Sequence, residues 1–141
     1  MADDYAALKK LNRDTFHAET DGETQIAGQG WKAFLQQVLA DEFQIRRAKA
    51  GTPQQKQNKK QMIAWIAGHP GPPRHVHEQE EVIWCNETLG AVTCRITFNG
   101  QDYQNVKMLK KTSQGQWQCV YWQVTQLTAE GNFYNPHPPV R

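Results

Sequence analysis

Apolar positions repeat with a helical period in the first half of the chain and with a period of two in the second half. Residues 3–19 carry apolar side chains at roughly helical spacing, with two acids near the start. Residues 31–43 carry them at i, i+3, i+4, i+7 and i+8, which is the clearest helical pattern in the sequence. We therefore predict two amphipathic helices before any strand.

A strand and a third helix are predicted next. Apolar and polar residues alternate within residues 42–51, which favours a short strand. Thr52 can cap a helix, and Gln55 would complete a weak capping box with it. The apolar residues that follow extend this helix to Gly68, a natural stop before Pro70. The first half thus predicts about three helices with one strand between them.

The second half predicts an antiparallel meander. Period-two alternation marks four strands, at residues 75–86, 90–100, 101–111 and 115–127. Asn99-Gly100 is a strong signal for a tight hairpin between the second and the third. Helices followed by such strands indicate an α+β, cone-like fold, with the helices packed on a curved, mainly antiparallel sheet. We assign residues 1–127 to one domain and 128–141 to an irregular Pro-rich tail.

Composition excludes several classes of protein. Lys and Arg number 16 against 14 Asp and Glu, a balance that argues against nucleic-acid binding. Apolar runs stay far below the roughly 18 residues of a membrane span, and the N-terminus has acids where a signal peptide needs bases. We expect a cytoplasmic protein without a membrane partner. Cys85, Cys94 and Cys119 are odd in number and unevenly spaced, which predicts reduced thiols.

The order of these segments resembles a known superfamily. Five segments show this resemblance: FLQQVLADEFQIRRAKAG, NKKQMIAWI, GAVTCRITFNG, NVKMLKK and GQWQCVYWQVT. Together they are similar to the nuclear transport factor two-like superfamily, in particular its small bacterial SnoaL-like members. The resemblance implies a conical cavity between helices and sheet. It does not fix an activity, because this fold hosts isomerases, dehydratases, cyclases, assembly hubs and ligand binders.

A looser resemblance concerns the association domain of calcium/calmodulin-dependent kinase II. By that match, Arg95 and Lys107 face one cavity, with Tyr121 and Gln123 across from them. Lysine stands where that domain has a second arginine, so the planar fork that grips a carboxylate is missing there.

Two interpretations of the sheet faces remain open. In one, the apolar face meets the helices as core and the polar face meets water. In the other, which the resemblance favours, the polar set lines a cavity and the apolar set packs on a second subunit. This predicts a homodimer through the following stripe: Val92, Cys94, Ile96, Val106, Met108, Val120 and Trp122.

The candidate site residues follow from this interpretation. The ligand-binding set is Arg95, Lys107, Tyr121, Gln123 and Trp31, the last as an apolar wall. The catalytic candidates are His17, Asp14 and Glu81, since acid–base chemistry in this fold needs such a group in the cavity. His75 and His77 share a strand face, but no third ligand has suitable spacing. We expect no metal and no cofactor.

Three functions fit these residues. The leading one is binding of a small, anionic or carbonyl-bearing molecule in the cavity. The alternatives are an isomerase or dehydratase that uses general acid–base catalysis and a non-catalytic interaction or assembly module. The sequence leaves open whether the chain is an enzyme.

Overall fold

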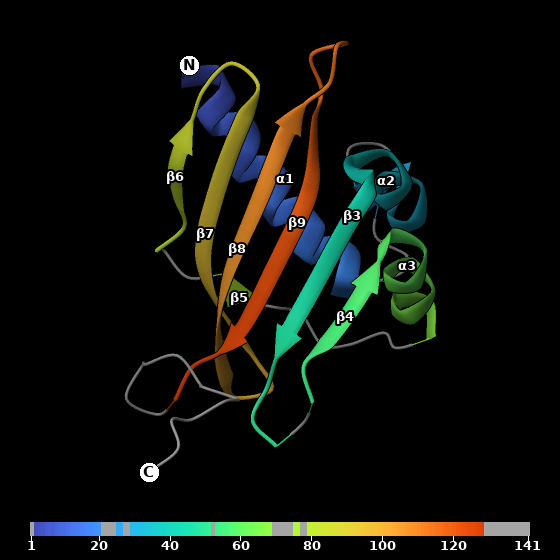
Figure 1. Ribbon diagram of the computed structural model, residues 1–141, viewed down its shortest axis with the longest axis vertical. Helices are drawn as coiled ribbons and strands as arrows, with labels where there is room; N and C mark the ends of the chain where they lie inside the picture. Colours follow the sequence, from blue (N-terminus) through green and yellow to red (C-terminus); the bar gives the residue numbers. More distant parts are fainter. Residues whose placement is uncertain are drawn as a thin grey trace.

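Three helices pack on one face of a large sheet in the computed structural model of the chain (Figure 1). The structure describes residues 2–20, 25–26, 29–51, 53–68, 75–76 and 79–128. The helices are α1 (Ala2–Thr20), α2 (Trp31–Val38) and α3 (Lys59–Gly68). The strands are β1 (Gln25–Ile26), β2 (Gln29–Gly30), β3 (Leu39–Ala48), β4 (Gln55–Asn58), β5 (His75–Val76), β6 (Glu81–Cys85), β7 (Leu89–Phe98), β8 (Gln101–Lys111) and β9 (Trp117–Gln126).

The large sheet has seven strands in the order β4-β3-β9-β8-β7-β5, with β6 also paired to β7. Every pair in it is antiparallel except β3–β9, which is parallel. Figure 1 shows α1 running obliquely across one face, with α2 and α3 beside β3 and β4. The predicted α+β cone and the meander from β6 to β9 are confirmed.

The helix boundaries differ from the prediction in two places. The second helix ends at Val38 rather than at residue 43, because Leu39–Ala48 pairs with β9 as a ten-residue strand. The third helix starts at Lys59, since the residues before it form β4 on the edge of β3.

A capping box does open this third helix, but later in the chain than predicted. The Oδ1 atom of Asn58 accepts from the backbone N–H of Gln61 at 2.8 Å. The backbone N–H of Asn58 in turn donates to Oε1 of Gln61 at 2.9 Å. The cap is therefore Asn58, and the predicted cap Thr52 lies outside the described residues.

The segment predicted as one strand over residues 75–86 contains two. β5 and β6 pair with different parts of β7, so a single straight strand is wrong. His77 and the predicted tail from residue 129 onward lie outside the described residues.

The hairpin between β7 and β8 decides which side chains face the helices. Its turn is the two-residue Asn99-Gly100, with φ of 51° and 75°. This turn pairs Val92 with Lys107. Residues directly opposite in a ladder share a face. Because Val92 is buried in the core, Lys107 points inward as well.

Arg95 therefore points to the other face of the sheet. It alternates along β7 with the core residues Cys94 and Ile96, which are 0% and 5% exposed. The expectation that Arg95 and Lys107 face one cavity is wrong, because the pairing register joins odd positions of β8 to even positions of β7.

A β-bulge in β9 determines which side chains of that strand face the helices. Met108 pairs with Tyr121 and Leu109 pairs with Cys119, which leaves Val120 as the extra residue. The alternation reverses at this point. Core positions are Trp117 and Cys119 before the bulge and Trp122 and Val124 after it. Neither predicted face is continuous along the strand.

The predicted dimer stripe is likewise split between the two faces. Val92, Cys94, Ile96 and Trp122 are buried under the helices, so they cannot form an exposed apolar patch. Met108 is 37% exposed on the helix-free face.

Candidate functional site

A column of polar side chains lies inside the cone along β8. Tyr103, Asn105 and Lys107 occupy alternate positions and are 7%, 1% and 0% exposed. They point toward the helices because the hairpin register pairs them with the core residues of β7. A lysine and an asparagine in such a place need partners, since burying polar groups without hydrogen bonds is costly.

The ammonium group of Lys107 contacts neutral oxygens and two aromatic rings. Its Nζ donates to Oδ1 of Asn12 at 2.7 Å and to the backbone oxygen of Asn12 at 3.2 Å. The same nitrogen lies 3.6 Å from the ring centroid of Phe16 and 3.9 Å from that of Trp122. Both are within cation–π distance. Among the described residues, no carboxylate forms an ion pair with it.

Burial without a counter-ion weakens the charged form of this lysine. Desolvation lowers the pKa of Lys107 from 10.5 to about 8. Burial acts on the neighbouring thiols in the opposite direction, raising the pKa of Cys119 to about 12 and that of Cys94 above its ordinary value. Lys107 can thus lose its proton at mildly alkaline pH, whereas the thiols stay protonated there.

Asn12 connects Lys107 to a buried carboxylate. Its Nδ2 donates to Oε2 of Glu80 at 2.6 Å, and Arg13 pairs with the other oxygen of Glu80 at 3.0 Å. Glu80 is only 8% exposed. Sequence reasoning singled out the neighbouring Glu81, which is exposed. Nothing in the local sequence pattern distinguishes the two, because Glu80 lies outside the regular strand.

The side-chain amide of Asn105 uses its oxygen but not its nitrogen in hydrogen bonds to other described residues. Its Oδ1 accepts from Nε1 of Trp122 at 2.7 Å. Its Nδ2 is buried and has no hydrogen-bond partner in the described part of the chain. Such a donor is rare in a folded protein and is a natural position for an acceptor atom of a ligand.

A cleft opens beside this column, and we call it the Arg47 cleft. Its lining residues are Glu19, Arg47, Lys49, Trp65, Ile96, Phe98, Tyr103 and Val124. They come from the end of α1, the end of β3, α3 and the sheet strands β7, β8 and β9. The cleft encloses about 40 Å³, well below the roughly 300 Å³ of a typical ligand site.

Arg47 is held firmly at this cleft. Its Nη1 donates to Oε1 of Gln57 at 2.6 Å, and its guanidinium lies 4.8 Å from the ring centroid of Trp65. Glu19 approaches it at 3.9 Å, and both side chains are 6% exposed. Buried charges at this distance create a local field that a polar ligand can sense.

The cleft borders the polar column. Tyr103 lines it, and Asn105 is the next inward residue along β8. Two residues of a strand span roughly 6.6 Å, so Asn105 lies about that far along β8 from Tyr103. Lys107 follows at the same spacing.

Most of the predicted ligand-binding residues lie elsewhere. Tyr121 donates its OH to Oε1 of Gln123 at 2.7 Å on the helix-free face of the sheet. Arg95 approaches Asp102 at 3.5 Å on the same face. Trp31 begins α2 and packs partly buried against the main core. Of the predicted set, only Lys107 belongs to the polar column.

The predicted catalytic candidates are not brought together. His17 and Glu81 are exposed. Asp14 pairs with Lys10 at 2.6 Å on the surface of α1. None of these three lines the Arg47 cleft. In the described residues, no group of three or more His, Cys, Asp and Glu side chains could hold a metal ion, and no helix is long and apolar enough to cross a membrane.

Comparisons with solved structures identify the fold. A protein of unknown function from Silicibacter pomeroyi, described as NTF-2 like, matches with a TM-score of 0.64 and 13% identity, over 86% of this chain and 93% of its own. Another NTF-2 like protein of unknown function, from Pseudomonas aeruginosa, matches at 0.64 and 11%, over 86% and 99%. The chain has the nuclear transport factor two-like fold.

A third structural neighbour carries a functional name. It is described as a candidate ketosteroid isomerase from Parabacteroides distasonis, and it matches with a TM-score of 0.61 and 12% identity over 87% of both chains. No protein-family model and no curated protein matches the sequence. At such identities the comparisons establish the NTF2-like architecture, and any function has to be argued from the residues of the site.

Proposed function

We propose that this protein binds a small carbonyl-bearing or anionic molecule inside the cone, through the Arg47 cleft. The observation that carries this proposal is the polar column of β8. Its Asn105 has a buried Nδ2 with no hydrogen-bond partner among the described residues, and the buried Lys107 lies two positions away on the same strand face. Both groups donate hydrogen bonds, so they select an acceptor oxygen.

The surroundings suit a ligand with an apolar body and one oxygen-bearing end. Trp65, Phe98 and Tyr103 line the cleft and offer aromatic surface. A carbonyl or carboxylate oxygen that reaches past Tyr103 would accept from Nδ2 of Asn105 and would bring negative charge toward Lys107. The gain is large where water is excluded, because charges interact more strongly in a low dielectric.

Binding has to widen the cleft, since about 40 Å³ holds no more than a few water molecules. Trp65 and Phe98 are only partly buried, so their side chains can move apart at less cost than core residues. Filling of the cleft by Trp65 and Tyr103 is also the feature expected of a pure interaction module. A ligand screen separates these two functions.

The test is a thermal-shift screen with benzoate, short-chain carboxylates and cyclic ketones. A ligand that binds only the folded state raises the melting temperature. Asn105→Asp keeps an acceptor for Trp122 but removes the donor, so it should abolish the shift. Arg95→Ala, on the helix-free face, is the matched control and should retain it.

Two outcomes contradict the proposal. If no compound shifts the melting temperature of the wild type, the interaction-module function is favoured. If Arg95→Ala abolishes a shift that Asn105→Asp leaves intact, the ligand binds on the helix-free face beside Tyr121 and Gln123.

A second candidate function is acid–base catalysis on a carbonyl compound. It is favoured by Lys107, whose pKa of about 8 allows a neutral amine at moderately alkaline pH. Glu80 is coupled to it through Asn12 and could stabilise the protonated amine. The test is deuterium exchange at the α-carbon of a cyclic ketone, followed by NMR. Exchange that equals the buffer rate, or that persists in Lys107→Met, would exclude this role.

We also propose that the protein forms a homodimer through the helix-free face of the sheet. Trp84, Ala91, Met108 and Tyr121 are aligned across four adjacent strands on this face. Trp84 and Met108 are 41% and 37% exposed, so the row presents apolar surface to a partner. Sedimentation should give a dimer that Met108→Lys dissociates without loss of helix signal. A stable wild-type monomer at micromolar concentration would refute it.

A further inference from the structure

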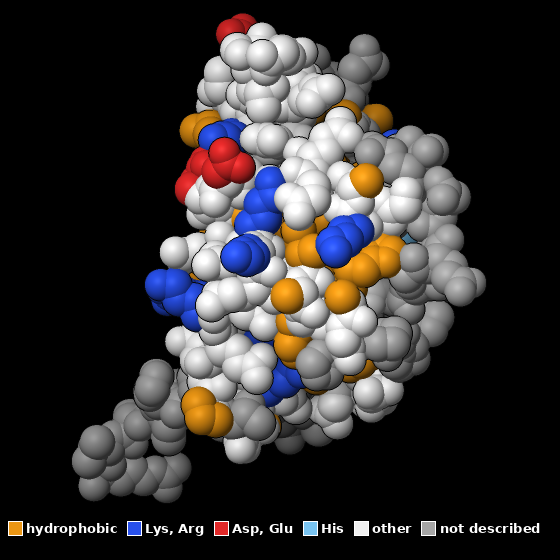
Figure 2. Space-filling model, turned by 90° about the vertical axis from the view of Figure 1, so that its right-hand side faces the viewer, with side chains coloured by type: hydrophobic (Ala, Val, Ile, Leu, Met, Phe, Trp, Pro, Cys, Tyr) orange, Lys and Arg blue, Asp and Glu red, His pale blue; other side chains and the backbone are white. Residues whose placement is uncertain are grey.

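An open groove lies between α2 and α3, away from the Arg47 cleft. Its volume is about 580 Å³, and we call it the α2–α3 groove. From α3, the exposed Ala64 and the edge of the nearly buried Ile63 contribute apolar surface, whereas Lys32, Lys59 and Lys60 contribute three ammonium groups. Figure 2 shows this side of the molecule, with Lys and Arg side chains spread around an orange apolar patch. The groove combines an apolar floor with a positive rim.

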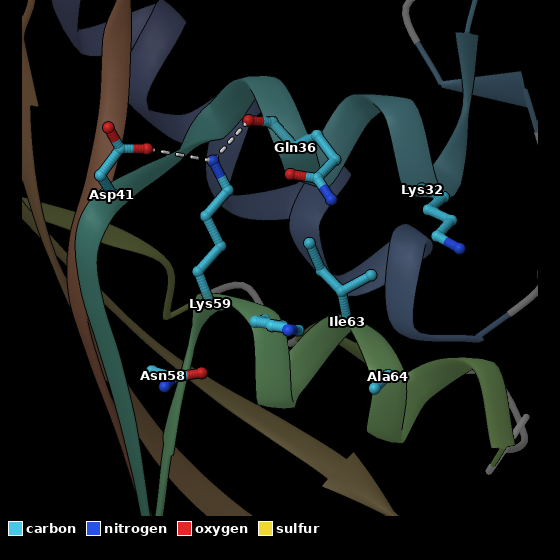
Figure 3. A pocket seen from close by; sticks show the side chains of 8 residues that line it. Lys32, Gln36, Asp41, Asn58, Lys59, Ile63 and Ala64 are labelled. Atoms are coloured by element: carbon cyan, nitrogen blue, oxygen red, sulfur yellow. Dashed lines mark hydrogen bonds and ion pairs between the residues drawn. The ribbon is translucent and has the colours of Figure 1, made fainter.

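One of the three lysines is used by the fold itself. Nζ of Lys59 donates to the backbone oxygen of Gln36 at 2.7 Å, and it lies 3.7 Å from Oδ1 of Asp41 (Figure 3). The Gln36 oxygen belongs to the last turn of α2, where carbonyl groups lack helical partners. Lys59 thus ties α3 to α2 and offsets the charge of Asp41, the acid that lines the groove.

The other two lysines keep their charge unneutralised. Lys32 and Lys60 are exposed, and neither forms a hydrogen bond or an ion pair with any other described residue. Figure 3 shows Lys32 extending from α2 into the space between the helices. Lys60 lies in the first turn of α3, which holds no acid and where the helix dipole is also positive. The rim therefore has a positive potential without internal compensation.

We propose that the α2–α3 groove is a docking site for an acidic amphipathic helix of a partner protein. The groove is bordered by helices of eight and ten residues, which at 1.5 Å per residue span roughly 12 and 15 Å. Three turns of a partner helix match that length. Its apolar stripe lies on Ile63 and Ala64, and its carboxylates face Lys32 and Lys60.

Charge complementarity favours this partner over a neutral or basic one. Each carboxylate that approaches Lys32 or Lys60 gains an attraction that solvent only partly screens and removes repulsion at the start of α3. The apolar floor adds specificity, because a purely acidic chain leaves it uncovered. Binding should therefore need both charge and an apolar face.

The experiment measures fluorescence anisotropy of a labelled 14-residue helical peptide that carries Glu on one face and Leu and Ala on the other. We expect binding to the full chain that weakens at least fivefold when NaCl rises from 50 to 300 mM. Lys32→Glu and Lys60→Glu should each weaken it at least fivefold. Lys9→Glu, a matched change at an exposed lysine of α1, should change it less than twofold.

A substitution at Ala64 tests the shape of the groove independently of its charge. Ala64→Gln fills the groove without altering its charge, and it lies on an exposed helical position that tolerates glutamine. It should also weaken binding.

The proposal is overturned if the peptide fails to bind at 200 µM or if a scrambled peptide of the same composition binds as tightly. It is also overturned if Lys9→Glu weakens binding as much as Lys60→Glu, or if inorganic phosphate at matched ionic strength displaces the peptide.

Discussion

The buried ammonium of Lys107 makes a pH-dependent contribution to stability that can be measured. Its pKa is about 8 in the folded chain and is expected near 10.5 in the unfolded chain. Below pH 8 both states hold the proton. Between pH 8 and 10.5 the unfolded state holds more of it, so the contribution of this group to the free energy of unfolding rises with pH.

The size of the effect follows from the gap between the two pKa values. One pKa unit corresponds to about 1.4 kcal/mol, so the whole gap is worth about 3 kcal/mol, of which about 2.5 kcal/mol is realised by pH 10. Lys107→Met removes this titration. The difference in unfolding free energy between wild type and variant should therefore shift in favour of the wild type by about 2.5 kcal/mol from pH 7 to pH 10.

The comparison with a variant is essential, because buried thiols act in the opposite direction. Burial raises the pKa values of Cys94 and Cys119, so the unfolded chain loses those protons first and stability falls as the pH rises above 9. Desolvation, the largest cause of these raised pKa values, is common to wild type and variant. Urea unfolding followed by circular dichroism at pH 7, 8, 9 and 10 gives the difference.

Lys9→Met, the same substitution at an exposed lysine of α1, is the control. A difference for Lys107→Met that stays constant from pH 7 to pH 10 within about 0.5 kcal/mol would contradict this prediction. It would mean that Lys107 reaches solvent and that β8 does not place it in the core.

Further predictions concern the elements that frame the site. Asn58→Ala removes the capping box of α3 and should lower the unfolding free energy by about 1 kcal/mol, whereas Gln54→Ala outside the cap should not. Gly90→Ala would place its Cβ 2.8 Å from Cδ1 of the fully buried Leu8, so a loss of about 1–3 kcal/mol is expected from urea unfolding. Gly100→Ala forces a side chain into φ of +75° in the β7–β8 turn and should cost about 1 kcal/mol; an unchanged midpoint would contradict that turn geometry.

Much of the fold is predictable from periodicity and turn signals. The helix of residues 3–19 and the hairpin at Asn99-Gly100 come from strong local patterns, and both are confirmed. The register of β8 is predictable too, because a two-residue turn places Val92 opposite Lys107. Counting residues outward from the turn places Arg95 and Lys107 on opposite faces of the sheet. Alternation along each strand, without the pairing between strands, does not show this.

Other features depend on tertiary contacts that no local pattern records. The bulge at Val120 reverses the faces of β9, and it is visible only from the partner strand β8. The early end of α2 at Val38 results from the parallel pairing of β3 with β9, which overrides helical periodicity. Arg47 was missed as a site residue for a related reason, since its meeting with Glu19 and Trp65 requires three elements to come together.

The proposed ligand site lies inside the cone and opens at the Arg47 cleft. The most direct measurement is a titration with benzoate followed by amide and indole ¹⁵N–¹H NMR. We expect the largest shifts on the backbone amides of Tyr103 and Asn105 and on the indole of Trp65. Shifts confined to Arg95 and Tyr121 on the helix-free face, or no saturable shifts at all, would contradict it.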